Sequence, residues 1–161
     1  MAPASTFRLG LPSRGAVAPG RRRQRGSNII EFTLTITVIL FMIFWIFEII
    51  MVMWTYSVMA DAAREGVRYA IVHGSHNAFC SGGPGGGCDP TANKVKTKVG
   101  EYTGLSFHDT SAMNVAVNYL DGNNHPGSRV QVTITYTYVP YISLPWTSPT
   151  LHITSEGRIM N

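Results

Sequence analysis

The feature that most constrains this chain is an apolar stretch near its N-terminus that carries almost no charge. Between about residues 29 and 54 only Glu31 and Glu48 are charged, and residues 32–47 contain no charged side chain at all. A helix needs roughly 20 apolar residues to cross the hydrocarbon core of a bilayer. The stretch exceeds that length, so the sequence predicts a membrane-spanning helix over about 29–54.

The helical pattern continues well beyond the predicted membrane segment. No proline occurs between Pro19 and Pro84, and the first natural helix stop after the apolar stretch is Gly74. A single helix over residues 27–73 would be about 70 Å long, which is roughly twice the thickness of a bilayer core. We therefore expect its second half to stand outside the membrane as a stalk.

Basic residues are concentrated before the apolar stretch. The formal net charge is +4, but residues 1–26 hold six arginines and no acid, which leaves seven basic and nine acidic side chains in the rest of the chain. The remainder therefore lacks the basic character of a nucleic-acid-binding protein. Pro, Gly, Ser and Arg dominate the leader and predict disorder. By the positive-inside rule, the leader stays in the cytoplasm and the chain after Tyr56 crosses the membrane.

The junction between leader and helix has two interpretations. Gly26 offers a protease an uncluttered backbone, so the chain is either cut after Gly26 or kept as a plain signal-anchor. Cleavage would give Ser27 a free ammonium group. Because an ionised carboxylate is costly in hydrocarbon, Glu31 would then pair with that amine, in its own chain or a neighbour's, and set the register between helices. Otherwise Glu31 lies at the headgroup boundary and is solvated.

The outer end of the predicted span carries the second carboxylate. Glu48 lies 17 residues after Glu31, about 25 Å along a helix. It is either interfacial or paired with another subunit. Trp54 and Tyr56 are typical of the aromatic belt at a membrane–water interface.

Small residues recur every four positions beyond the membrane segment, at Ala62, Gly66 and Ala70. Such a stripe allows another backbone to approach closely. The partner is either the protein's own sheet or a neighbouring helix. Residues of opposite charge also lie three positions apart, which predicts weak surface ion pairs on the helix. These pairs are Asp61 with Arg64 and Glu65 with Arg68.

Two cysteines flank a glycine-rich loop over residues 74–90. Five of the seven residues between Cys80 and Cys88 are glycine, so the segment can bend back and close a disulfide. An extracytoplasmic location favours that bond. The alternative is a metal site that adds His73 and His76 to the two thiolates, but the spacing is not a familiar zinc pattern. We predict a disulfide and no metal.

The C-terminal part, residues 74–161, predicts a small α+β domain. Asp89 and Pro90 are typical of a helix start, and the pattern that follows predicts a short helix over about 92–102. Its lysines are largely turned outward.

Alternating apolar residues predict strands over 113–119, 130–138 and around 151–155 of an antiparallel sheet. The turn cluster DGNNHPG at 121–127 joins the first two strands. The loop PYISLPW that precedes the third strand is either an exposed contact patch or a lid over the end of the sheet.

Several segments of the sequence are similar to one protein family. GSNIIEF, with Glu31 fifth after Gly26, resembles the processing site of type IV pilin-like precursors. FEIIMVMWTYSVMADAAREGVRYAIVHG and SRVQVTITYTYVP resemble the TadE-like family, the minor pilins or pseudopilins of tight-adherence pili. The resemblance covers about residues 26–141. It implies cleavage by a prepilin peptidase after Gly26 and retention in the inner membrane.

The resemblance also implies a function and a set of partners. The chain would be an assembly protein that supports pilus biogenesis, adherence and biofilm formation. Its partners would be inner-membrane lipid, the prepilin peptidase, other pilin or minor pilin subunits and the inner-membrane assembly platform. The C-terminal domain would lie in the periplasm or outside the cell. No cofactor is expected.

The sequence leaves one other class of function open. The alternative is a static single-pass anchored periplasmic binding or sensor domain that keeps its leader and for which Glu31 is incidental. An enzyme is not predicted, because the five histidines have no evident carboxylate or nucleophile array and no serine lies in an elbow motif.

Overall fold

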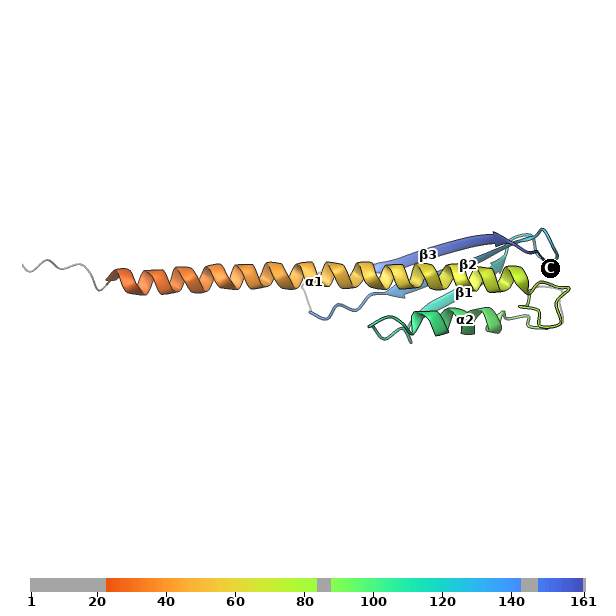
Figure 1. Cartoon of the computed structure of the whole chain (residues 1–161), viewed down its shortest axis with the longest axis horizontal. Coiled ribbons are helices and arrows are strands. Elements are labelled where there is room, and N and C mark those ends of the chain that lie inside the picture. Colours follow the sequence, from red (N-terminus) through yellow and green to blue (C-terminus); the bar gives the residue numbers. More distant parts are fainter. Residues whose placement is uncertain (1–22, 84–87, 143–147, 161) are drawn as a thin grey trace, which may run out of the picture. The chain divides into compact units, whose positions relative to one another are not determined.

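The computed structural model describes residues 23–83, 88–142 and 148–160. In chain order the described elements are α1 (Arg23–Val72), α2 (Asn93–Thr103), β1 (Asn114–Tyr119), β2 (Arg129–Thr137) and β3 (Thr150–Arg158) (Figure 1). The expected α+β fold, with a long N-terminal helix, a short helix and a three-stranded antiparallel sheet, is confirmed. The basic leader up to residue 22 lies outside the described residues, as do 143–147 of the PYISLPW loop.

Helix α1 is a single element of 50 residues. It begins at Arg23, slightly before the predicted start, and ends at Val72, close to the predicted His73. At its C-terminus the Asn77 side-chain amide donates to the Val72 carbonyl at 3.2 Å and satisfies one of the acceptors that every helix end leaves free. The absence of prolines from this stretch of sequence explains why the helix continues without interruption.

The chain divides into two compact units, residues 1–42 and 43–161. The second unit contains the C-terminal part of α1 together with α2 and the sheet. The predicted stalk is therefore not a free rod: its buried residues belong to the hydrophobic core of the domain. From α1 these are Met59, Ala62, Ala63, Val67 and Ala70.

The sheet has the order β1-β2-β3, and both pairings are antiparallel. Its register brings Val117 opposite Val132 and Ile134 opposite Ile153. Because side chains alternate along a strand, these apolar residues share one face. In the turn between β1 and β2, Asp121 accepts from the Arg129 backbone N–H at 2.8 Å and from its guanidinium at 2.9 Å. This pair and its hydrogen bonds hold the pKa of Asp121 below its usual range.

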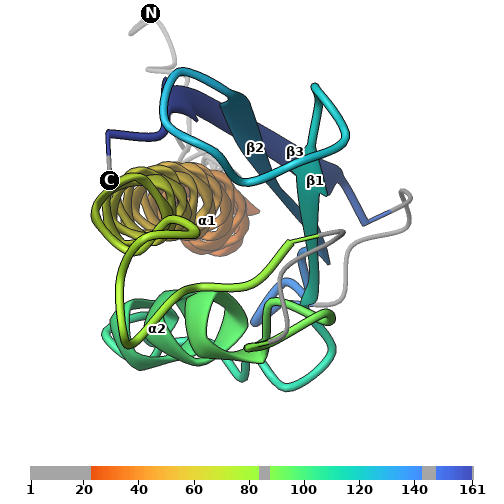
Figure 2. The same ribbon diagram turned by 90° about the vertical axis from the view of Figure 1, so that its right-hand side faces the viewer.

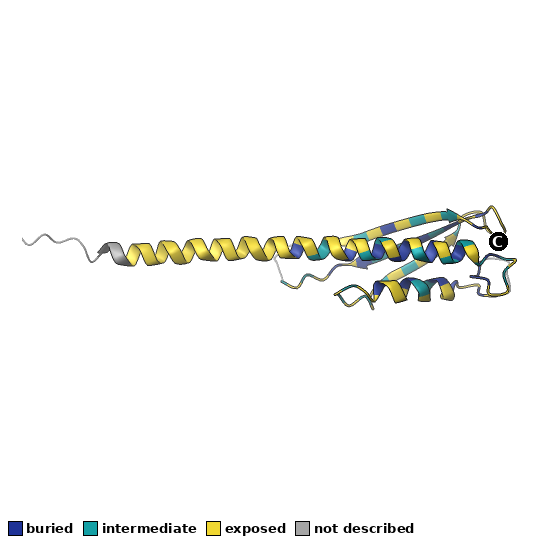
Figure 3. Ribbon diagram, viewed as in Figure 1, coloured by how far each residue is buried: buried dark blue, intermediate teal, exposed yellow. Residues whose placement is uncertain are grey.

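Both helices lie against the same face of the sheet (Figure 2). Every second residue of β2 is buried from Val130 to Tyr136, and the alternate residues are only half-buried. Val95 and Val99 of α2 fill the space between α1 and the sheet. Burying one such side chain stabilises a fold by roughly 1.5–3 kcal/mol. Figure 3 shows buried residues in the C-terminal part of α1, in α2 and in the strands, whereas the N-terminal part of α1 is coloured as exposed.

The start of α2 differs from the prediction. Pro90 and Thr91 form a turn, and the helix begins only at Asn93 after Ala92, which adopts a left-handed conformation with φ 51°. The predicted N-cap residue, Asp89, is therefore replaced in that position by Ala92, although the Asp89 carboxylate still accepts from the Lys94 backbone N–H at 2.9 Å. Burial alone would raise the pKa of Asp89, but these backbone hydrogen bonds outweigh it and lower the pKa.

Candidate functional site

The predicted processing residues lie in the first turns of α1. Gly26, Ser27 and Glu31 are all exposed, and the bond between Gly26 and Ser27 is helical. Side chains from residue 26 to 47 are exposed without exception. This stretch of apolar helix is therefore available for lipid or for other helices. The helix as a whole is long and apolar enough to cross a membrane.

Glu48 is the first buried residue of α1. It is 6% exposed, although it follows the exposed apolar stretch directly. Its Oε1 accepts a hydrogen bond from the Tyr138 hydroxyl at 2.8 Å and another from the Tyr141 backbone N–H at 3.2 Å. Burial, together with the hydrogen bond to this carboxylate, raises the pKa of Tyr138 well above its usual range. The hydrogen-bond partners of Glu48 thus come from its own chain and lie in the segment that directly follows β2.

Aromatic rings surround this carboxylate. The His108 ring packs against Tyr138 and Tyr141 at centroid distances of 4.5 and 4.4 Å, and its Nδ1 shares a hydrogen bond of 3.3 Å with the Thr55 hydroxyl. Among the described residues, Glu48 Oε2 and His108 Nε2 are buried side-chain atoms without a hydrogen-bond partner. The cluster ties α1 to both loops at one end of the sheet.

The stripe of small residues packs inside the domain. Ala62 and Ala70 are fully buried, and a Cβ atom added to Gly66 would lie 2.5 Å from Cγ2 of Val99 and 3.6 Å from Cγ1 of Val132. Of the two interpretations left open by the sequence, the structure shows the one in which the chain's own sheet and α2 approach the stripe.

The two charge pairs form on the outer surface of α1. The Arg64 guanidinium lies 3.0 Å from the Asp61 carboxylate, and the Arg68 guanidinium lies 3.8 Å from that of Glu65. Both arginines are largely exposed, so each pair contributes little to stability. Their place on the side of α1 that the sheet does not cover leaves them accessible to other molecules.

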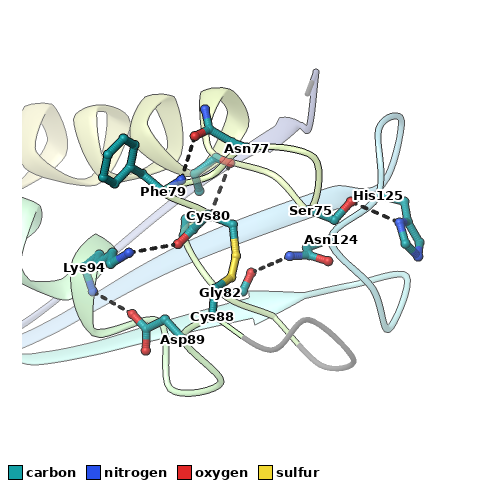
Figure 4. The surroundings of a disulfide bond; sticks show 12 residues. Ser75, Asn77, Phe79, Cys80, Gly82, Cys88, Asp89, Lys94, Asn124 and His125 are labelled. Carbon is teal, nitrogen blue, oxygen red and sulfur yellow. Dashed lines mark hydrogen bonds between the residues drawn. A yellow bond between two sulfur atoms is a disulfide. The ribbon is translucent and has the colours of Figure 1, made fainter.

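Cys80 and Cys88 form the expected disulfide, with their Cα atoms 6.0 Å apart (Figure 4). Hydrogen bonds hold the segments around it. Lys94 Nζ donates to the Cys80 carbonyl at 3.4 Å, and the Asn124 amide donates to the Gly82 carbonyl at 3.1 Å. The disulfide closes the loop between α1 and α2, and the two hydrogen bonds connect this loop to the start of α2 and to the turn between β1 and β2.

Gly82 is required by its backbone conformation. Its φ is +99°, and an added Cβ would lie 1.8 Å from the Asp89 carbonyl oxygen. From the sequence, the glycines predicted only that this segment can bend back. At Gly82 the structure instead shows a buried residue in one defined conformation. The tight approach of Asp89 is the reason. Residues 84–87 of the glycine-rich loop lie outside the described residues.

The histidines that a metal site would have used have other contacts. His73 stacks on Tyr69 at 4.1 Å and hydrogen-bonds its carbonyl, and the ring centroid of His76 lies 6.5 Å from that of His125. Within the ranges that the structure describes, no three His, Cys, Asp or Glu side chains gather as a metal-ligand set.

The family comparison matches a segment that lies entirely within α1. The family model described as TadE-like protein matches residues 26–68. This segment is similar to the TadE-like family. The match confirms the family resemblance over that segment. The matched segment contains the exposed apolar part of α1, the carboxylates of Glu31 and Glu48 and both charge pairs. No curated protein and no solved structure matches the chain.

The matched segment ends at Arg68, an exposed residue of α1 two positions before the buried Ala70. The disulfide loop, α2 and the sheet lie beyond it, so the resemblance predicted for the rest of residues 26–141 stays a prediction. The part that matches is the part of the helix that would contact lipid, followed by the part that packs on the sheet.

The sequence did not predict which residues surround Glu48, namely Thr55, His108, Tyr138 and Tyr141. A signal for Thr55 was present. Glu48, Thr55, Met59 and Ala62 lie on one side of a helix, since their spacing follows the helical period. Extending the small-residue stripe backwards along α1 would have identified Glu48 as buried. Tyr138 lies 90 residues away in the sequence, and no local pattern indicates that contact.

Reducing the disulfide is expected to destabilise the domain by about 2.5 kcal/mol, because a loop of this size loses that much chain-entropy stabilisation when it opens. The check is thermal unfolding of the full chain in detergent, with and without a reductant, followed by circular dichroism. The control is the double variant Cys80→Ala/Cys88→Ala, whose melting temperature should not respond to the reductant. An unchanged melting temperature in the unsubstituted protein would contradict the prediction.

Proposed function

We propose that this chain is a pilin-like, membrane-anchored assembly protein of a tight-adherence pilus. The observation that carries the proposal is the TadE-like match over residues 26–68, which coincides with an apolar helix whose residues 26–47 are all exposed. An exposed apolar helix needs lipid or other helices around it. Pilin-like subunits use such helices both to anchor in the membrane and to pack together.

The proposal includes an orientation and a processing step. The arginine-rich leader stays in the cytoplasm by the positive-inside rule. The domain then lies in the periplasm or outside the cell, and the anchor in the inner membrane. A prepilin peptidase cuts after Gly26, and the new amine at Ser27 gives Glu31 a partner in the membrane. Other pilin or minor pilin subunits and the assembly platform are the protein partners, and pilus biogenesis supports adherence and biofilm formation.

In this role the chain is structural and does not catalyse a reaction. Its residues act through packing and charge pairing. The surface pairs Asp61–Arg64 and Glu65–Arg68 are weak ion pairs on the exposed side of α1, and the proposal assigns them no part in assembly.

A second candidate function is a static anchored binding or sensor domain. The observation that favours it is the helical conformation of the bond between Gly26 and Ser27, because a protease acts on extended backbone and would first have to unwind this turn. In that case the leader is kept and Glu31 is incidental.

The N-terminus of the membrane-extracted protein distinguishes the two functions. Intact-mass and N-terminal peptide mass spectrometry are expected to find a chain that begins at Ser27. The matched control is the same protein from cells that lack the prepilin peptidase, in which the chain should keep its leader. An intact leader in cells with an active peptidase would contradict processing and support the static domain.

A further inference from the structure

We propose that the domain makes a second contact with the membrane besides the helix, through a surface that we call the basal patch: Trp54, Phe107, Val139 and Tyr141. The occupant of this surface is the headgroup region of the same bilayer that the helix crosses. This inference goes beyond the proposed function. It requires only that α1 spans a membrane, and it does not depend on processing or on pili.

The basal patch is formed by large apolar side chains that water would otherwise cover. Their exposed fractions are 48% for Trp54, 69% for Phe107, 65% for Val139 and 53% for Tyr141. The ring of Trp54 lies 5.9 Å from that of Phe107, and the Tyr141 hydroxyl donates to the Phe107 carbonyl at 2.9 Å. One helix and two loops, one after α2 and one after β2, therefore meet at a single place.

The contacts of Glu48 set the level of the patch along α1. The Tyr141 backbone N–H lies 3.2 Å from Glu48 Oε1, so this loop reaches the residue next to Phe47, the last residue of the uncharged run. Trp54 follows Glu48 by six residues, which is about 9 Å of helix rise. Polar groups such as the Glu48 carboxylate are costly in hydrocarbon. The hydrocarbon core therefore ends at about Glu48.

The length of the helix gives the same boundary. Residues 29–47 span about 28 Å at the standard helical rise, close to the roughly 30 Å of a hydrocarbon core. The outer end of the membrane segment therefore falls near Glu48, before the Trp54 that the sequence suggested. Trp54, Phe107 and Tyr141 then lie at the headgroup level, and no free length of helix separates the domain from the membrane.

The chemistry of the basal patch fits this location. Trp and Tyr side chains concentrate at membrane–water interfaces, where an apolar ring and a polar atom are both accommodated. The patch contains no Lys or Arg, so its binding needs no anionic lipid. Because it continues the exposed apolar surface of α1 at residues such as Ile50 and Met53, lipid that surrounds the helix also reaches the patch.

The test is the membrane depth of a tryptophan placed at Phe107. The full chain carries Trp45→Phe, Trp54→Phe and Trp146→Phe, so that Phe107→Trp supplies the only tryptophan. The protein is placed in phosphatidylcholine nanodiscs whose lipids carry bromine, a quencher, either near the headgroup or deep in the acyl chains. We expect Trp at position 107 to emit at a shorter wavelength than a tryptophan exposed to water. Its emission should lose more intensity with the shallow bromine than with the deep one.

The matched control is Phe79→Trp in the same background. Phe79 is 70% exposed, against 69% for Phe107, but it lies beside the disulfide beyond the far end of α1. Neither bromine should quench it. A second reporter, Leu105→Trp, lies in the same loop as Phe107, is 68% exposed and should follow Phe107→Trp. Circular dichroism and an intact disulfide verify folding.

Two results would overturn the inference. In the first, the reporters at 105 and 107 are quenched no more than the control at 79. In the second, the shift in emission appears only when nanodiscs contain two copies of the protein, which would assign the basal patch to a second copy. Either result leaves the N-terminal processing test unaffected, so failure of this inference is distinguishable from failure of the proposed function.

Discussion

Replacing Glu31 with alanine is expected to abolish pili on the cell surface without destabilising the folded domain. The proposed role of this carboxylate is to pair with an N-terminal amine in a low dielectric, and alanine cannot form that pair. Glu31 is exposed, lies in the first of the two compact units and is not among the core residues of the second. The measurement is the number of pili per cell by electron microscopy, in a strain whose only copy of the gene carries the change.

The control for this experiment is Glu65→Ala, which removes another carboxylate from the same helix. Glu65 forms only a surface pair with Arg68, so pili should remain normal. Glu31→Gln keeps the size of the side chain but not its charge, and it should fail like alanine if pairing is the role. Immunoblotting must show equal protein levels. Normal pili in the Glu31→Ala strain would contradict the register role.

Replacing Gly66 with alanine is expected to destabilise the domain by about 1–3 kcal/mol, the usual cost of overpacking a core. The new methyl group would lie 2.5 Å from Cγ2 of Val99. Val99 is a fully buried β-branched side chain and cannot rotate out of the way without moving its own neighbours. The melting temperature of the full chain in detergent, followed by circular dichroism, is the measurement.

The same substitution at Gly100 is expected to have the opposite sign. Gly100 lies in α2, and a Cβ atom built on it meets nothing within 4 Å. Alanine should therefore stabilise the helix by roughly 0.5–1 kcal/mol, because it restricts the unfolded chain and is the better helix former. Equal effects at both positions would show that helix propensity, and not the close approach of α2 to α1, decides the outcome at Gly66.

The regular elements could be predicted because their causes are local. An apolar stretch without proline favours one long helix wherever it lies, and the alternation from Val130 to Tyr136 predicts a strand with one buried face. The disulfide followed from two cysteines on either side of a glycine-rich segment. Each of these inferences depends on residues that are close together in the sequence.

The environment of each candidate site residue could not be predicted in the same way. A stripe at Ala62, Gly66 and Ala70 has the same spacing whether it packs on another subunit or on the chain's own sheet. Asp89 at a helix start looks like an N-cap residue, yet its carboxylate reaches Lys94 only because of the turn that Pro90 and Thr91 form. Both outcomes depend on how separate segments are placed in space.

By itself, the sequence determined that this protein has an apolar N-terminal helix, a basic leader and a small α+β domain with a disulfide. These properties follow from local periodicity, charge and composition. Only the tertiary structure decided that half of the helix forms the core of the domain and that Glu48 is buried. The physical reason is that a buried carboxylate needs hydrogen-bond donors, and its donors at Tyr138 and Tyr141 reach it only after the sheet has folded against α1.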